Sequence, residues 1–165
     1  MGVRNCADIG ENLQKITQRL LSNQNLLKLL YYTDKDPLSQ KDLTEEQIKN
    51  SIYEKLIKII PRLGPKGTET SHSIIAMRVV KGNKNIENGE FKDVLIAIEV
   101  FVPLTQWMIK NSNLRPFAIL GEIEKSLNGK TINGLGKMSG GDFELNFLTE
   151  EISSYEQTFT IISYD

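Results

Sequence analysis

The residues best suited to chemistry in this sequence are a single histidine, His72, and a single cysteine, Cys6. Histidine ordinarily titrates near neutral pH, so His72 is the first candidate for a general base. It opens an expected strand with nothing nearby to orient it, and we interpret it as a solvated side chain. Cys6 lies in an expected first helical turn, where a thiolate can be stabilised. Without a neighbouring histidine we interpret it as incidental. The sequence therefore predicts no metal site and no Ser-His-Asp catalytic set.

Glu99 is a carboxylate inside the most apolar segment of the chain, residues 92–102. Burial in such a segment raises the pKa of a carboxyl group, which is one way to prepare a general acid or base. Structural ion pairs also perturb carboxylates, however. We therefore favour a non-catalytic role for Glu99, either in an ion pair with Arg78 or Lys92 or at a face between subunits.

The glycine-rich segment 129–141 invites a test for phosphate-binding motifs. Gly129-Lys130-Thr131 matches the end of a phosphate-binding loop, but the glycine required five positions earlier is replaced by Glu124. A dinucleotide fingerprint started in this segment fails at Ser139, and neither motif has the required strand before it and helix after it. We interpret residues 130–141 as a flexible linker. A small-ligand or nucleotide-binding protein or enzyme that uses segment 129–141 stays as an alternative function.

The composition is that of an ordinary globular domain. The chain has 165 residues, of which 39% are hydrophobic and 25% charged, and 20 Lys and Arg against 21 Asp and Glu give a net charge of −1. This length suits one domain, which we assign to residues 1–165. A protein that grips nucleic-acid phosphates normally shows a basic excess, which is lacking here. No stretch approaches 18 consecutive apolar residues, so we expect no membrane partner. We expect no cofactor, no metal and no enzymatic activity.

Helical spacing of apolar residues predicts two N-terminal helices within residues 1–32. Thr44 and Gln47 have the spacing of a capping box, in which each side chain satisfies a backbone donor of the other residue, and predict a short helix over 44–51. Residues 53–60 fit a helix or a strand, and we favour a strand that Pro61 ends. Residues 115–128 predict a further helix, with Gly129 supplying its left-handed cap.

Four further segments have the pattern of strands. They are residues 72–80, 92–102, 143–148 and 155–164. The first two are joined by a long polar loop at 82–91, and the last two form a hairpin in which Phe143, Leu145 and Phe147 are expected on one face. The resulting fold class is α+β: a small antiparallel or mixed sheet of about four to five strands flanked by helices. The N-terminal segment 1–32 is helical, and residues 53–165 form the sheet-and-helix core.

The strand at 92–102 is apolar on both faces, which is typical of a central strand covered on both sides. One well-formed helix follows the first strand pair. The second face must then be covered either by the N-terminal helices or by a partner chain, because monomers rarely leave large apolar patches exposed.

Several segments share their order and their residue types with one protein family. They are NLLKLLYYTDKD at 25–36, Pro61, FVPLTQW at 101–107, LRPFAILGEIEKSLNGK at 114–130, and the closing hairpin GDFELNF…YEQTFTI. In these segments the chain resembles the head–tail joining, or neck, proteins of tailed bacteriophages. Within that family it looks like the tail terminator, or tail completion, class. The resemblance covers about residues 25–165.

This resemblance implies a structural virion protein at the neck, the head-proximal end of the tail, assembled in the host cytoplasm. Such proteins commonly form a ring, expected to be hexameric, that caps the tail tube and docks the head-completion or connector proteins. DNA passes through the lumen without specific binding. A ring requires a heterologous interface, and we expect the sheet edge and the 82–91 hairpin to form it. The residues expected at subunit or partner interfaces are Lys84, Asn88, Glu90, Glu99, Trp107 and Lys137. A generic protein-binding adaptor stays as a further alternative.

Overall fold

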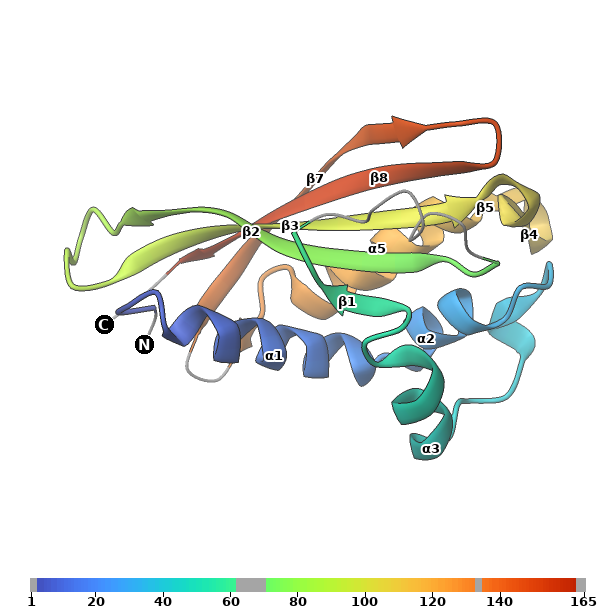
Figure 1. The fold of residues 1–165 in the computed structure, drawn as a ribbon, viewed down its shortest axis with the longest axis horizontal. Coiled ribbons are helices and arrows are strands. Elements are labelled where there is room, and N and C mark those ends of the chain that lie inside the picture. Colours follow the sequence, from blue (N-terminus) through green and yellow to red (C-terminus); the bar gives the residue numbers. More distant parts are fainter. Residues whose placement is uncertain (1–2, 62–70, 133–134, 163–165) are drawn as a thin grey trace.

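The computed structural model describes residues 3–61, 71–132 and 135–162, and its centre is a mixed six-stranded sheet in the order β1-β2-β3-β8-β7-β6 (Figure 1). β1 pairs with β2 in parallel, and every other neighbouring pair is antiparallel. The strands are β1 (Ile57–Ile59), β2 (Ile74–Lys84), β3 (Lys92–Pro103), β6 (Thr131–Ile132), β7 (Gly136–Leu148) and β8 (Ile152–Ile162). A separate short pair consists of β4 (Met108–Ile109) and β5 (Asn113–Leu114).

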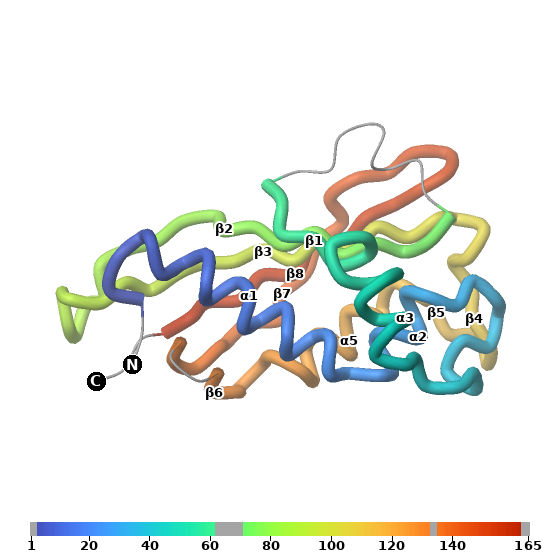
Figure 2. Tube along the Cα trace, turned by 60° about the horizontal axis from the view of Figure 1, so that its bottom comes forward, coloured from blue at the N-terminus to red at the C-terminus, as the bar shows by residue number. Residues whose placement is uncertain are grey.

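The α-helices of the described residues lie on one side of the sheet, as Figures 1 and 2 show. They are α1 (Asp8–Leu21), α2 (Gln24–Tyr31), α3 (Glu45–Gln47) and α5 (Arg115–Leu127). We call the covered side of the sheet the helix side and the other side the open side. Alternate residues of β3 from Val94 to Val102 point to the helix side and are fully buried. The α+β class is confirmed.

The helix ends follow the capping signals in the sequence. The Asn23 side chain accepts a hydrogen bond from the Leu26 backbone N–H at 3.1 Å and so caps α2. Thr44 and Gln47 form the predicted capping box. α5 is followed by Gly129, whose φ of +69° is the left-handed conformation expected after a helix.

Two segments differ from the prediction in extent. The strand expected over 53–60 is confined to β1, because a single helical turn at Ile48–Ile52 precedes it and Glu54 has a positive φ of 59°. The loop expected at 82–91 begins later, because β2 continues to Lys84 before β3 starts at Lys92. The tip of this hairpin, which we call the β2–β3 tip, therefore comprises residues 85–91.

The predicted flexible linker at 130–141 is wrong for the residues that the structure describes. Residues 131–132 form β6, and β7 begins at Gly136 and runs through the whole glycine-rich stretch. A Cβ atom at Gly140 would lie 2.8 Å from the Phe159 Cα, so glycine is required where β7 approaches β8. A bulge follows between Gly140 and Asp142. These glycines therefore mark a bulged strand, and glycine in a strand commonly has this function. Residues 133 and 134 lie outside the described residues.

The structure also shows which face of the sheet the N-terminal helices cover. The N-terminal helices share the helix side with α5, so they do not cover the open side (Figure 2). At the centre of the open side, Ala97, Glu99 and Phe101 of β3 are nonetheless buried. Part of their environment is a polar cluster described below.

Arg115, the first residue of α5, connects the helix layer to the loops around it. Its side chain is fully buried, and its guanidinium donates to the backbone carbonyls of four residues. These are Leu29 at 2.7 Å, Tyr32 at 2.8 Å, Asp34 at 2.6 Å and Gln106 at 3.0 Å. A cation is favourable at the C-terminal end of α2, where carbonyls lack helical partners. Burial lowers the pKa of Arg115, and the charge of Asp34 opposes that shift.

Candidate interaction surface

The end of the β7–β8 hairpin rises away from α1, α2 and α3 (Figure 1), and this part of the molecule carries exposed apolar side chains. Phe143 and Leu145 of β7 are 54% and 53% exposed, and Phe117 of α5 is 37% exposed. Tyr155 of β8 and Trp107 are partly buried beside them. We call these five residues the aromatic surface. Clustered exposed apolar side chains of this kind mark interaction sites on soluble proteins.

The rings of the aromatic surface contact one another. The Phe117 ring lies 5.0 Å from Tyr155 and 5.8 Å from Phe143, measured between centroids. Phe143 and Tyr155 are 6.2 Å apart, and Trp107 and Tyr155 are 6.3 Å apart. Aromatic pairs at such separations attract one another in tilted and edge-on geometries. The surface is therefore organised before any partner binds, which reduces the entropy lost on binding.

Separate elements position these side chains. The Phe117 side chain extends from the first turn of α5, which Arg115 fixes through its four carbonyl contacts and through its backbone N–H bond to the Trp107 carbonyl at 2.8 Å. Phe143 and Leu145 lie opposite Gln157 and Tyr155 on the helix side.

The expectation that Phe143, Leu145 and Phe147 share one face is wrong for Phe147. A bulge between Leu145 and Phe147 shifts the register, so Phe147 pairs with Ser154 and belongs to the open side. An inserted residue in a strand exchanges the two faces for every residue that follows.

The open side behind this hairpin holds the polar cluster around Glu99. The Arg78 guanidinium lies 3.1 Å from the Glu99 carboxylate and also pairs with Glu156. The Ser154 hydroxyl and the Asn146 amide donate to the same Glu99 oxygen at 2.5 and 2.7 Å. The predicted ion pair with Arg78 is confirmed. The Glu99 side chain, predicted at an interface, is 6% exposed and links β3 to β2, β7 and β8.

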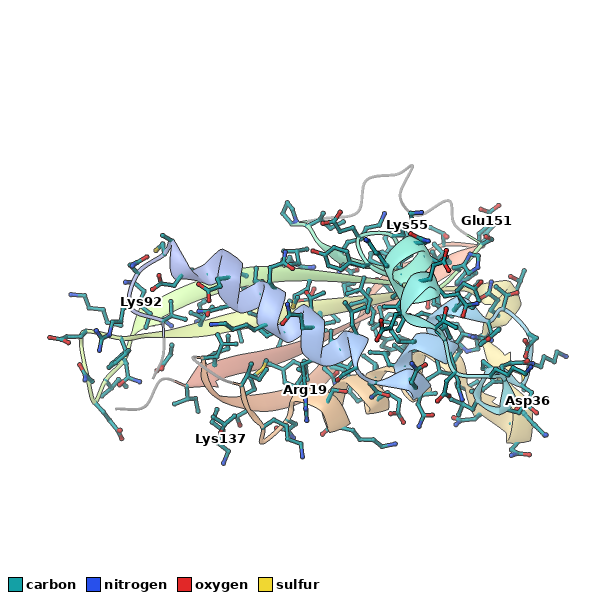
Figure 3. The ribbon with its side chains drawn as sticks, turned by 90° about the horizontal axis from the view of Figure 1, so that it is seen from below. Arg19, Asp36, Lys55, Lys92, Lys137 and Glu151 are labelled. Atoms are coloured by element: carbon teal, nitrogen blue, oxygen red, sulfur yellow. The ribbon has the colours of Figure 1, made fainter. Side chains whose placement is uncertain are left out.

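The other predicted interface residues fall in three places. Lys84 lies at the end of β2, and Asn88 and Glu90 lie in the β2–β3 tip, at the opposite end of the molecule from the aromatic surface (Figure 1). Lys137 is exposed at the start of β7 beside β6 (Figure 3). Trp107 belongs to the aromatic surface. Lys84, Asn88 and Glu90 thus lie together at one end of the molecule, whereas Trp107 and Lys137 each lie elsewhere.

Sequence reasoning did not identify Phe117, Phe143, Leu145 and Tyr155 as a surface. Strand alternation indicates which residues share a face, but it carries no information on whether a helix covers that face. The pairing of Phe117 with Phe143 joins residues far apart in the sequence, and no local pattern reports it.

The chemical candidates have ordinary surroundings. The His72 Nδ1 lies 3.0 Å from the Ser71 hydroxyl, and Cys6 is exposed with a free thiol. Within residues 3–61, 71–132 and 135–162, no group of three or more His, Cys, Asp or Glu side chains is placed to hold a metal. None of the helices in that part of the chain is long and apolar enough to cross a membrane.

The sequence of this chain matches a known protein family. The model of the YomW family matches residues 23–161, which include the strands from β1 to all but the last residue of β8 and the whole aromatic surface. The protein belongs to the YomW family. That family bears the name of a Bacillus phage-derived protein, so this YomW-family chain is a phage-related protein. No curated protein matches the chain. The family match starts at the N-cap of α2 and leaves α1 outside.

Proposed function

We propose that this phage-related protein is a structural component of the virion, of the tail terminator or neck class. In this proposal it forms a ring, expected to be six-fold, that caps the tail tube and joins the tail to the head-completion or connector proteins. It has no catalytic role, DNA passes through its lumen without specific binding, and it acts at the head-proximal end of the tail after assembly in the host cytoplasm.

The aromatic surface is the observation that carries this proposal. Phe143 and Leu145 expose about half of their area on a projecting hairpin, and covering them would contribute favourable free energy to assembly. On the reverse side the ion pairs of Arg78 link β2 to β3 and β8, and the hydrogen bond from Asn146 of β7 to Glu99 joins the hairpin to this cluster. An organised apolar surface on a supported hairpin suits a subunit whose role is to contact other proteins.

The test is assembly and incorporation into virions. We expect the purified protein to form oligomers in light scattering coupled to size exclusion, with rings visible by negative stain, and to be present in purified virions. The double variant Phe143→Ser, Leu145→Ser should lose incorporation while retaining its far-UV circular dichroism. Leu38→Ser is the control, because Leu38 is also 42% exposed but lies in the turn Pro37–Ser39, outside the aromatic surface.

A strictly monomeric protein that is absent from virions would overturn the proposal. Stable association with a non-virion protein through the same surface would instead favour the generic adaptor.

A further inference from the structure

The two edges of the sheet carry opposite charge. β2 contains Arg78, Lys81 and Lys84 and no carboxylate. From Met138 to Ile162, which covers nearly all of β7 and β8, the chain contains five carboxylates and no lysine or arginine. The near-zero net charge of the whole chain therefore conceals a separation of charge across one sheet.

Both edges are also open over much of their length. β1 covers β2 at Ile75–Met77 alone, and β6 covers β7 at Gly136 and Lys137 alone. Among the described residues, no strand pairs with the outer side of β2 beyond Met77 or of β7 beyond Lys137. An open edge presents unpaired backbone N–H and C=O groups that can accept another strand.

One stretch on each edge is suited to strand pairing. Residues 80–84 of β2 and 142–148 of β7 are all exposed. Bulges interrupt β2 between Val79 and Lys81, and β7 between Gly140 and Asp142 and between Leu145 and Phe147. The regular exposed stretches are therefore 81–84 and 142–145, each four residues long.

We propose that residues 81–83 of one copy pair with residues 142–144 of the next copy, within these two stretches, so that the sheet continues from subunit to subunit. This rests on the proposed function, because it supplies the head-to-tail contact that a ring requires. β2 and β7 run in opposite directions within the sheet. Copies in the same orientation therefore meet as an antiparallel pair, in which short strands bond readily.

The side chains select one register, with Lys81 opposite Glu144. Both residues belong to the open side, where they form a cross-strand pair of opposite charge. The same register places Phe143 over Gly82 on the helix side. Gly82 has no side chain, and an added Cβ would have no neighbour closer than 3.8 Å. The phenyl group of Phe143 from the next copy therefore has room above Gly82.

This register shifts successive copies along the strands. Within one chain the row of Glu144 runs through Glu156 and Glu99 to Ala76, whereas Lys81 lies in the row of Leu95. The two rows are four residues apart along β3, or about 13 Å. A stagger between neighbouring strands is also what allows a sheet to close into a ring.

Charge reversal tests the pairing by sedimentation velocity at low salt. Lys81→Glu and Glu144→Lys, made separately, should each weaken self-association about tenfold, because like charges then face one another. The chain carrying both substitutions should recover the wild-type association. Lys49→Glu is the matched control, since Lys49 is exposed and belongs to the helical turn Ile48–Ile52 and not to β2 or β7.

Cross-linking tests the register. In a Cys6→Ser background, oxidation of the Lys81→Cys, Glu144→Cys chain should give a ladder of covalent oligomers. The Lys49→Cys, Glu144→Cys chain should not. Single reversals without effect together with no ladder would overturn the pairing, and rings that still formed would leave the proposed function intact. A wild-type protein that stays monomeric at every concentration would also overturn the pairing, while the virion test would decide the proposed function separately.

Discussion

The centre of β3 and the far half of β7 both present a row of apolar side chains on the helix side, but the two rows have opposite environments. Ile98 of β3 is fully buried, whereas Phe143 and Leu145 of β7 are half exposed. β3 has a strand on each side and α5 against it. The far half of β7 has one neighbouring strand and extends past α5. Apolar alternation therefore indicates a face, and the surrounding layers determine whether that face is core or contact surface.

Removing Arg115 should have the largest effect, because it would detach the helix layer that distinguishes the two regions. Arg115→Met leaves four carbonyls without their charged donor around a fully buried side chain, and we expect a loss of at least about 3 kcal/mol in the free energy of unfolding. Urea denaturation measures this loss. Arg115→Lys keeps the charge with fewer donors and should be intermediate. A Met variant as stable as the wild type would contradict this account of Arg115.

A matched pair of truncations compares the two strands directly. Ile98→Ala should cost about 2–5 kcal/mol, because it opens a cavity in a fully buried site. Leu145→Ala should change stability by less than about 0.5 kcal/mol, since its side chain is half exposed. Both values come from urea denaturation of the isolated protein. Equal losses at the two positions would mean that the far half of β7 is core after all.

Gly140 marks the point where β7 changes from one environment to the other. Gly140→Ala forces a Cβ against the β8 backbone at a φ of +152°, and we expect a loss of about 1–3 kcal/mol. Gly10→Ala serves as the opposite control, because Gly10 lies in α1 with nothing within 4 Å of its added Cβ. That substitution should stabilise the protein by about 0.4–1 kcal/mol. Thermal unfolding compares the two, and a tolerated alanine at 140 would refute the close approach.

The smallest effect is expected from an exposed ion pair in the loops. Lys110 hydrogen-bonds the Asp36 carboxylate at 2.7 Å and lowers the pKa of Asp36. A carboxyl with a lowered folded-state pKa adds stability above its unfolded pKa, and this contribution disappears as the pH falls through the folded value. The contribution should therefore be lost only in acid. Carboxyl NMR titration of wild type and Lys110→Met checks this, and an unchanged Asp36 pKa would contradict it.

Local signals predicted much of the fold. The capping box at Thr44 and Gln47, the cap at Asn23 and the glycine after α5 depend on neighbouring residues, and each appears in the structure. The glycine-rich stretch was misassigned, because glycine is common in linkers and is also required where two strands approach closely. This stretch forms β7 because it pairs with β8, which lies further along the chain.

The candidate site was less accessible to sequence reasoning. The ion pair of Glu99 with Arg78 followed from their expected strands, whereas the contact between Phe117 and Phe143 required the packing of α5 against the hairpin. Lys84, Asn88 and Glu90 stay a prediction as interface residues, and Lys84 directly follows the β2 residues proposed here to pair between copies.

The α+β class, the helix ends and the apolar rows of the strands are predictable from the chain alone, because they depend on short-range spacing and on backbone preferences. The tertiary structure decided which faces are covered, where bulges exchange them, and that basic and acidic edges lie on opposite sides of one sheet. Exposure and edge position depend on neighbours distant in the chain, and a count that gives −1 for the whole chain cannot show where each charge lies.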